Sequence, residues 1–145
     1  MSPSTSQRGD GAAVIDDTYN ANPDSVRAAI DVLAAAPPPR WLVLGDMGEV
    51  GAQGPGFHRE AGAYAREAGI EKLYSAGPLA AEAAEEFGRG ARHFGSVEEL
   101  TAQVVADAAA SATAGTTILV KGSRFMRMER VVGALIGAPA VAGVH

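Results

Sequence analysis

The chain has 145 residues, of which 47 % are apolar and 20 % charged, a composition typical of one soluble globular domain. Its net charge of −5 excludes a basic surface for DNA or RNA, and the lack of cysteine excludes disulfides and thiolate metal sites. No apolar run approaches the roughly 20 residues of a membrane span, and the N-terminus lacks a hydrophobic signal core, so we expect a cytoplasmic protein without a membrane partner.

The two ends of the chain differ in composition from its middle. Residues 1–11 are rich in Ser, Gly and other polar residues, and residues 137–145 carry Gly, Ala and Pro without periodicity. Both stretches are typical of flexible tails or linkers. We therefore expect one folded domain over residues 12–136.

The first expected strand covers residues 13–15 and runs into an Asp-Asp pair. A helix follows, because Asn22 is a good N-cap, Pro23 suits the first helical position, and apolar residues then recur at helical spacing. The prolines at 37–39 stop that helix. This part of the chain therefore predicts a strand, a turn and a helix.

The middle of the chain repeats this order. A strand is expected over residues 41–44, followed by a Gly-rich loop to about Gly56 and a helix that closes at Gly69. Another strand covers residues 72–74, and the apolar spacing over residues 79–87 predicts the next helix.

The last third gives two further strand–helix pairs. A weak strand over residues 92–94 precedes a helix that opens with a capping box of Ser96 and Glu99. A strong strand covers residues 117–120, and a final helix is expected from Phe125 to Ile136 with Phe125 facing inward.

This alternation of strands and helices predicts an α/β domain, Rossmann-like, with three layers and a mainly parallel sheet covered by helices on both faces. Ligands of such domains bind outside the carboxyl ends of the strands. Three segments follow strands here: Asp16–Ser25, Gly45–Gly51 and Lys121–Arg124. We expect them to meet at one edge of the sheet.

The first segment offers groups for a nucleotide. A carboxylate such as Asp17 accepts hydrogen bonds from a ribose, and Asn20 and Asn22 offer donors and acceptors beside a helix N-terminus, which favours anions. The alternative is structural: Asn22 only caps the helix, and Asp16 and Asp17 only shape a turn. For Asn22 both roles are compatible.

The second segment contains Asp46 and Glu49 and is followed by His58. These side chains have the chemistry of a metal or acid–base cluster, but their spacing is not diagnostic of one. The alternative is a hydrogen-bonded histidine near a helix start. The glycines of the segment are more typical of backbone turns than of phosphate binding.

In the third segment Lys121, Ser123 and Arg124 surround a glycine that leads into a helix. Arginine grips a carboxylate or phosphate with two hydrogen bonds, and backbone N–H groups assist it. The alternative is a solvated basic turn. The sequence contains no phosphate-binding P-loop, no GxGxxG after the first strand and no nucleophile elbow, so this chain lacks the usual means to hold ATP phosphates alone.

At these segments the sequence resembles the Mur ligases, in the branch that joins D-alanyl-D-alanine to UDP-N-acetylmuramoyl-tripeptide. The matching runs are VIDDTYNANPDSVRAAIDVL at 14–33, LVLGDMGEVG at 42–51 and LVKGSRFMRMERVV at 119–132. Three long runs in the same order are specific, and the resemblance extends over residues 11–136.

The resemblance implies a C-terminal domain that closes over the ATP site of a three-domain ligase. ATP phosphorylates the substrate carboxylate, and the dipeptide amine attacks the acyl phosphate to form an amide. The chain resembles neither of the other two domains of such a ligase. These are the N-terminal domain, which holds the UDP-sugar peptide, and the central P-loop domain. We therefore expect ATP and Mg²⁺ to be bound mainly by the central domain, and this chain alone to be inactive, without a catalytic residue or metal site of its own.

Position by position, the resemblance implies that Asp17 contacts the nucleotide ribose and that Asn20 and Asn22 face its phosphates. Lys121, Ser123 and Arg124 match the run assigned to the dipeptide, at its carboxylate. Asp46 and His58 match family positions of accessory or unassigned role. Two other hypotheses are a free-standing nucleotide- or anion-binding module, and an interaction domain that would expose a large apolar patch instead of a polar edge.

Overall fold

The computed structural model describes residues 3–7, 11–110 and 115–137. In these residues six strands form one sheet in the order β1-β2-β6-β3-β4-β5, and every neighbouring pair is parallel except β1 with β2. The strands are β1 (Ser4–Gln7), β2 (Ala13–Asp17), β3 (Arg40–Gly45), β4 (Lys72–Ala76), β5 (Ala91–Phe94) and β6 (Thr117–Lys121). The predicted, mainly parallel sheet is confirmed.

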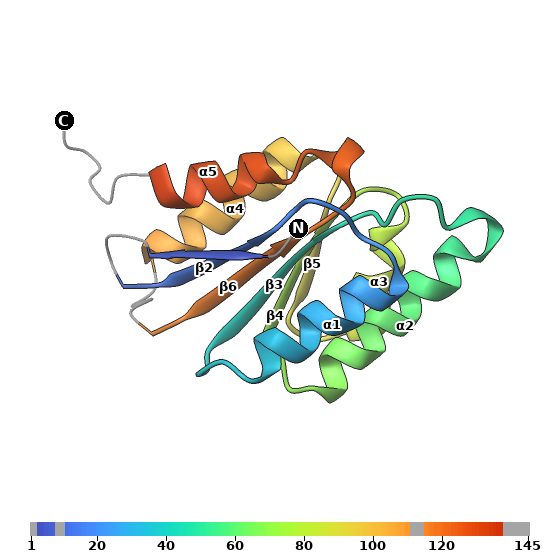
Figure 1. The fold of residues 1–145 in the computed structure, drawn as a ribbon, viewed down its shortest axis with the longest axis horizontal. Coiled ribbons are helices and arrows are strands. Elements are labelled where there is room, and N and C mark those ends of the chain that lie inside the picture. Colours follow the sequence, from blue (N-terminus) through green and yellow to red (C-terminus); the bar gives the residue numbers. More distant parts are fainter. Residues whose placement is uncertain (1–2, 8–10, 111–114, 138–145) are drawn as a thin grey trace.

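Helices cover both faces of this sheet. They are α1 (Pro23–Ala34), α2 (Gly54–Glu67), α3 (Ala80–Phe87), α4 (Val97–Ala110) and α5 (Glu129–Gly137), with 3₁₀ turns at Gly51–Gln53 and Arg124–Met126. α1, α2 and α3 lie on one face, and α4 and α5 lie on the other (Figure 1). This is the three-layer, Rossmann-like α/β arrangement that the sequence predicts.

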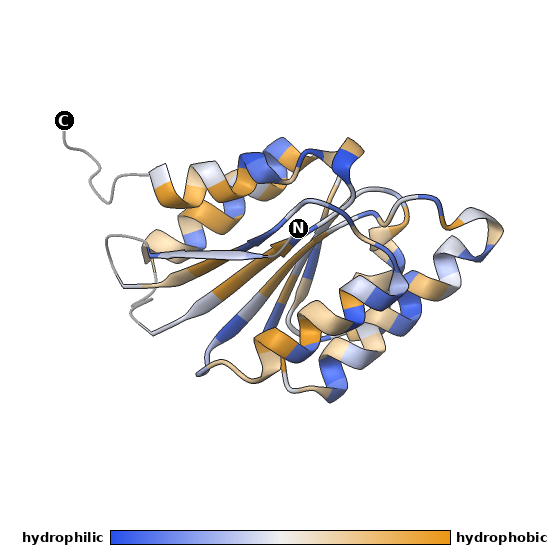
Figure 2. Ribbon diagram, in the orientation of Figure 1, coloured by the Kyte–Doolittle hydropathy of each residue, from blue (hydrophilic) through white to orange (hydrophobic). Residues whose placement is uncertain are grey.

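Neighbouring strand residues point to opposite faces, which creates two cores. Val14 packs with α4 and α5, whereas Ile15 packs with α1 and α2; Ile118 and Leu119 divide in the same way. Apolar residues therefore run along the strands and on the inward sides of the helices (Figure 2). Among the described residues no helix is long and apolar enough to span a membrane.

The start of α1 is fixed by its cap. The Asn22 side chain accepts a hydrogen bond from the Ser25 backbone N–H at 2.9 Å, and the Ser25 hydroxyl accepts one from the Asn22 N–H at the same distance. Pro23 takes the first helical position, where no N–H is needed. The predicted cap is confirmed, and it sets where the turn after β2 ends.

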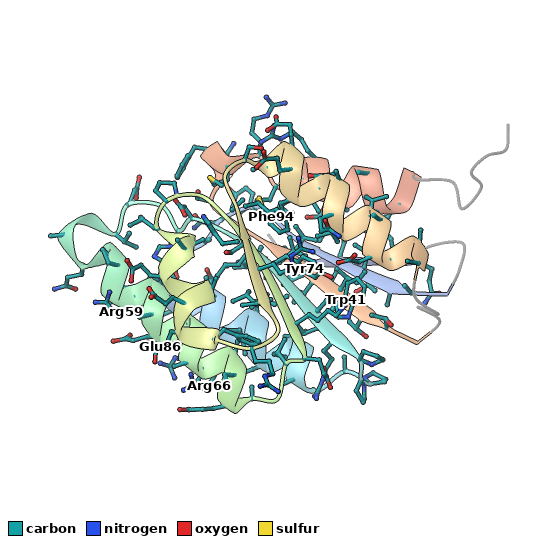
Figure 3. The ribbon with its side chains drawn as sticks, turned by 180° about the vertical axis from the view of Figure 1, so that it is seen from behind. Trp41, Arg59, Arg66, Tyr74, Glu86 and Phe94 are labelled. Atoms are coloured by element: carbon teal, nitrogen blue, oxygen red, sulfur yellow. The ribbon has the colours of Figure 1, made fainter. Side chains whose placement is uncertain are left out.

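On the first face α2 and α3 pack closely. A Cβ atom at Gly62 would lie only 2.2 Å from the backbone oxygen of Ala83, so this glycine permits the approach. At the rim of the contact the Arg66 guanidinium donates a hydrogen bond to the backbone oxygen of Glu86. Figure 3 shows both residues on these two helices.

On the opposite face two aromatic side chains anchor α4. The rings of Trp41 and Tyr74 are 5.6 Å apart and tilted, and the Tyr74 hydroxyl donates a 2.8 Å hydrogen bond to Asp107 of α4 (Figure 3). Burial of the ring and this bond to a carboxylate raise the pKa of Tyr74. This hydrogen bond holds α4 against β4, the strand that carries Tyr74.

The prediction of a flexible tail over residues 1–11 is wrong for Ser4–Gln7. This segment forms the antiparallel edge strand β1, in which Thr5 pairs with Ile15. Its polar side chains carry no apolar period, because the pairing uses backbone groups and the strand is largely exposed. Residues 1–2 and 8–10 lie outside the described residues. At the other end Gly137 still belongs to α5, and residues 138–145 lie outside the described part.

The predicted last helix also begins too early. Arg124–Met126 form a 3₁₀ turn, and α5 begins only at Glu129. Arg127 has a φ of 56°, a left-handed conformation that a helix cannot contain. Phe125, expected to face inward, is 67 % exposed, whereas Met128, also expected to face inward, is buried in the core.

Candidate functional site

The three strand-end segments meet at one edge of the sheet. β6 lies between β2 and β3, with Asp17 opposite Lys121 on one side and Leu44 opposite Lys121 on the other. The turns after these strands are therefore neighbours in space, although they are far apart in the sequence. The predicted convergence is confirmed, and it defines the candidate site.

A buried ion pair lies at the centre of this edge. The Lys121 Nζ is 3.1 Å from the Asp17 Oδ1, and the two side chains are only 3 % and 15 % exposed. A buried ammonium requires such a partner because it has lost its water shell. The sequence assigned these residues to two different ligands, whereas the structure joins them to each other.

The neighbouring carboxylate, Asp16, holds the turn after β2. Its Oδ1 accepts hydrogen bonds from the Thr18 hydroxyl at 2.6 Å and from the Thr18 backbone N–H at 3.2 Å. Past this turn, Tyr19, Asn20 and Asn22 are exposed. Asn22 uses its side-chain oxygen as the cap of α1, so the structural role considered from the sequence is present at this position.

Asp46 is part of the scaffold beneath the site. It is buried, and its Oδ1 accepts a 2.7 Å hydrogen bond from the Ala80 N–H at the first turn of α3. Its backbone oxygen accepts a 3.0 Å bond from the Ser123 N–H. Asp46 therefore connects the turn after β3 with α3 and with the turn after β6.

His58 is a second scaffold residue. It is fully buried on α2; its Nε2 accepts a 3.0 Å hydrogen bond from the Met47 N–H, and its Nδ1 lies 2.7 Å from the Gly54 backbone oxygen. Because one partner is a donor and the other an acceptor, the ring is neutral with the proton on Nδ1. In the described residues no group of three metal-ligating side chains forms, so the cluster with Asp46 and Glu49 is not present.

Ser123 is the polar group of this edge that lacks a partner. Its side chain is 3 % exposed, and among the described residues its hydroxyl is the buried side-chain donor without a hydrogen bond. Gly48 makes room beside it, since a Cβ there would lie 3.3 Å from the Ser123 Cβ. A buried hydroxyl without a partner is unfavourable and indicates a place for a ligand atom.

Arg124 and Tyr19 separate two depressions. The guanidinium carbon of Arg124 lies 5.3 Å from the centre of the Tyr19 ring. The first depression, of about 320 Å³, is lined by Ser4, Asp16, Asp17, Thr18, Tyr19, Arg124 and Glu129. The second, of about 560 Å³, is lined by Tyr19, Asn20, Asn22, Gly48, Glu49, Ser123, Arg124 and Phe125. We call them the acidic depression and the mixed-charge depression.

The structure thus adds residues to those singled out from the sequence. Tyr19, Phe125 and Glu129 line the depressions, and so does Glu49, which the sequence suggested as part of a metal or acid–base cluster. In the sequence these residues are distinguished only by their position shortly after the ends of expected strands. Tyr19 and Phe125, two of the large exposed apolar side chains among the described residues, border polar depressions, unlike the apolar patch of an interaction domain.

Comparison with known proteins identifies this arrangement. Residues 4–124 match the family model for the Mur ligase, glutamate ligase domain. The chain belongs to the Mur ligase family. The matched range includes β1 and ends at Arg124, so it contains every strand of the sheet and all three segments of the candidate site.

Several relatives of this Mur ligase domain are ligases of the same name. UDP-N-acetylmuramoyl-tripeptide–D-alanyl-D-alanine ligase of Escherichia coli is 40 % identical over 129 residues, which are 89 % of this chain and 28 % of that protein. The chain therefore spans just over a quarter of the length of this relative.

Solved structures of similar proteins have the same fold. A crystal structure of MurF from Acinetobacter baumannii has a TM-score of 0.84 and 30 % identity, over 92 % of this chain and 30 % of that one. MurF ligase from Thermotoga maritima, in complex with ADP, has a TM-score of 0.78 and 25 % identity, with 92 % and 30 % covered. The Mur ligase domain again corresponds to less than a third of each structure.

Proposed function

We propose that this chain is the C-terminal domain of an ATP-dependent ligase that joins D-alanyl-D-alanine to UDP-N-acetylmuramoyl-tripeptide in peptidoglycan synthesis. The relatives that bear this name match nearly the whole chain and extend well beyond it, which favours a ligase domain over a free-standing binding module. The missing N-terminal and central domains would supply the tripeptide site and the P-loop, with Mg²⁺ held beside the ATP phosphates.

The observation that carries this proposal is the polar edge formed by the three strand ends. It combines the unpartnered Ser123 hydroxyl and the exposed Arg124 with the Asp17 carboxylate and the Asn20 amide. We assign Ser123 and Arg124 to the carboxylate of the dipeptide, because a hydroxyl and a guanidinium both donate hydrogen bonds to such a group.

We assign the nucleotide end to the acidic depression. Its Asp17 carboxylate accepts from sugar hydroxyls, and its Tyr19 ring offers a face to a base. Asn20 and Asn22 line the neighbouring mixed-charge depression and lie beside the N-terminus of α1, where phosphate groups are favoured, so we place the phosphates past Tyr19, between the two depressions. The bound ADP of the Thermotoga maritima relative supports a nucleotide in this family. We give Lys121 the role of orienting Asp17 instead of direct dipeptide binding, because its ammonium faces that carboxylate.

A fusion protein tests the proposal. The chain is joined to the N-terminal and central domains of the Escherichia coli relative, and ADP release is measured with the tripeptide substrate and D-alanyl-D-alanine. The fusion is expected to form the amide only when ATP and the dipeptide are both present, whereas the isolated chain shows no turnover.

Two variants examine the nucleotide assignment in the same fusion. Asp17→Ala is expected to raise the KM for ATP, and Asn22→Ala to do so as well. Asn22→Ser is the matched control, because serine keeps the cap of α1 but removes the amide. Equal KM values for the parent, Asp17→Ala and Asn22→Ala would refute the assignment of this site.

A further inference from the structure

The mixed-charge depression holds one acid and one base among its described lining residues. Glu49 comes from the turn after β3 and Arg124 from the turn after β6, and the remaining lining groups are neutral. No described ion pair joins these two side chains, although both are exposed at the same depression. A pocket with one charge of each sign is complementary to a small molecule that also carries both charges.

The anionic end of such a molecule has a defined place. The Ser123 hydroxyl is buried in the wall of the depression without a partner, and Arg124 is the next residue in the chain. Both are hydrogen-bond donors to a carboxylate. Because Ser123 and Arg124 line the same depression as Glu49, we place the carboxylate on the first two and the cationic end toward Glu49.

The backbone at Glu49 supports a role for its side chain. Glu49 has a φ of 56°, a left-handed conformation that is unfavourable for a residue with a Cβ atom. Gly48 and Gly51 stand nearby in the same turn, and Gly51 takes a φ of 61° without strain. The strained position nevertheless carries a glutamate, and strained residues cluster where ligands bind.

The turn that carries Glu49 is also held in place. The Gly48 N–H donates a 3.0 Å hydrogen bond to the backbone oxygen of Ala21, and the Met47 N–H donates to His58. These bonds fix the turn to the segment after β2 and to α2. Glu49 is thus presented from a rigid support at the rim of the depression that Ser123 also lines.

We propose that Glu49 binds the ammonium group of a small zwitterion whose carboxylate lies on Ser123 and Arg124. This inference deepens the proposed function, on which it rests: the zwitterion is the incoming dipeptide, and Glu49 is a specificity residue for its amino end. It holds the amine at the rim of the depression.

Binding to the isolated, isotope-labelled chain tests the inference by NMR. The probes are D-alanyl-D-alanine, its N-acetyl derivative, which lacks the ammonium, and its C-terminal amide, which lacks the carboxylate. Gly48 and Ser123 amide shifts report on the depression. We expect the parent chain to prefer the dipeptide about tenfold over each derivative, a difference of about 1.4 kcal/mol.

Glu49→Gln is expected to abolish the preference over the N-acetyl derivative and to retain the preference over the amide. Arg124→Gln is expected to do the reverse. Glu49→Asn is a second variant with the same expected outcome as Glu49→Gln, since asparagine tolerates the left-handed conformation better than most residues with a Cβ atom. Glu85→Gln, at an exposed position on α3, is the control that removes one negative charge elsewhere. An unchanged preference in Glu49→Gln, or no shift with the dipeptide, overturns the inference.

The fusion protein separates this failure from failure of the proposed function. If the function holds and the inference holds, Glu49→Gln raises the KM for the dipeptide about tenfold and leaves the KM for ATP unchanged. An active fusion with an unchanged dipeptide KM in Glu49→Gln refutes only the role of Glu49. A fusion without ligation refutes the proposed function itself.

Discussion

Lys121 and Asp17 join the ends of two neighbouring strands by a buried ion pair, with 3.1 Å between Nζ and Oδ1. Lys121 is almost completely buried at the end of β6, and Asp17 closes β2. Each charge is tolerated there because the other is present. The pair fixes the middle of the candidate site and holds Asp17 at the acidic depression, where we assign the nucleotide.

Removing one partner of this pair should destabilise the fold strongly. Lys121→Met leaves the Asp17 carboxylate in a largely dry position, and we expect a loss of about 3 kcal/mol in the free energy of unfolding. The double variant Asp17→Asn with Lys121→Met should lose less than the sum of the two single losses. Urea unfolding of all four proteins measures this coupling, and additive losses would show that the pair is not coupled.

Ser123→Ala should leave the fold unaffected, because its hydroxyl has no partner among the described residues. We expect a change within about 0.5 kcal/mol in the free energy of unfolding, together with weaker dipeptide binding. Ser75→Ala is the matched control: its buried hydroxyl lies 2.7 Å from the His93 Nδ1, so its loss should cost about 1 kcal/mol. Equal destabilisation by both substitutions would contradict a hydroxyl reserved for a ligand.

His58→Ala should loosen the turn after β3. The substitution leaves the Met47 N–H and the Gly54 oxygen without their partner and opens a cavity, so we expect a loss of about 3 kcal/mol. The Met47 amide should also exchange its hydrogen faster. His93→Ala, on β5, is the control for the exchange measurement only, because it removes the partner of the buried Ser75 hydroxyl. Unchanged exchange at Met47 in His58→Ala would disprove the anchoring role.

Arg40 and Glu71 give the stability a dependence on pH. Burial raises the pKa of the Glu71 carboxyl, but hydrogen bonds and the charge of Arg40 outweigh this effect and lower the pKa from its ordinary value of 4.5. A lowered pKa contributes stability above 4.5 that is lost as the pH falls through the folded-state value. Because Glu71 is 41 % exposed, the effect is screened by solvent.

The variant Arg40→Met should remove this acid sensitivity along with the bonds that Arg40 donates to the backbone oxygens of Ala34, the last residue of α1, and Gly69, just past the end of α2. The midpoint of thermal unfolding, followed from neutral pH to below the ordinary Glu range, is expected to fall less steeply in this variant than in the parent. Parallel curves would show that another carboxylate is responsible.

Local signals were sufficient for much of the fold. The cap at Asn22, the apolar period of α1 and the apolar strands β3 and β6 all act within a few residues, and the structure confirms each. β1 left no such signal, because its polar side chains are largely exposed and only its backbone is engaged. The start of α5 was missed because Arg127 adopts a left-handed conformation, which an arginine in a run of helix-forming residues does not signal.

The sequence by itself determined the alternation of strands and helices, the strand ends at which polar residues gather, and the resemblance to a ligase family. Only the tertiary structure decided which of those polar residues face each other. In the fold Lys121 pairs with Asp17, and Asp46 and His58 form hydrogen bonds that hold the turns beneath the site. Ser123 and Glu49 line the same depression. The reason is physical: periodicity and capping are local, whereas burial and pairing of a side chain depend on strands that the sheet brings together from distant parts of the chain.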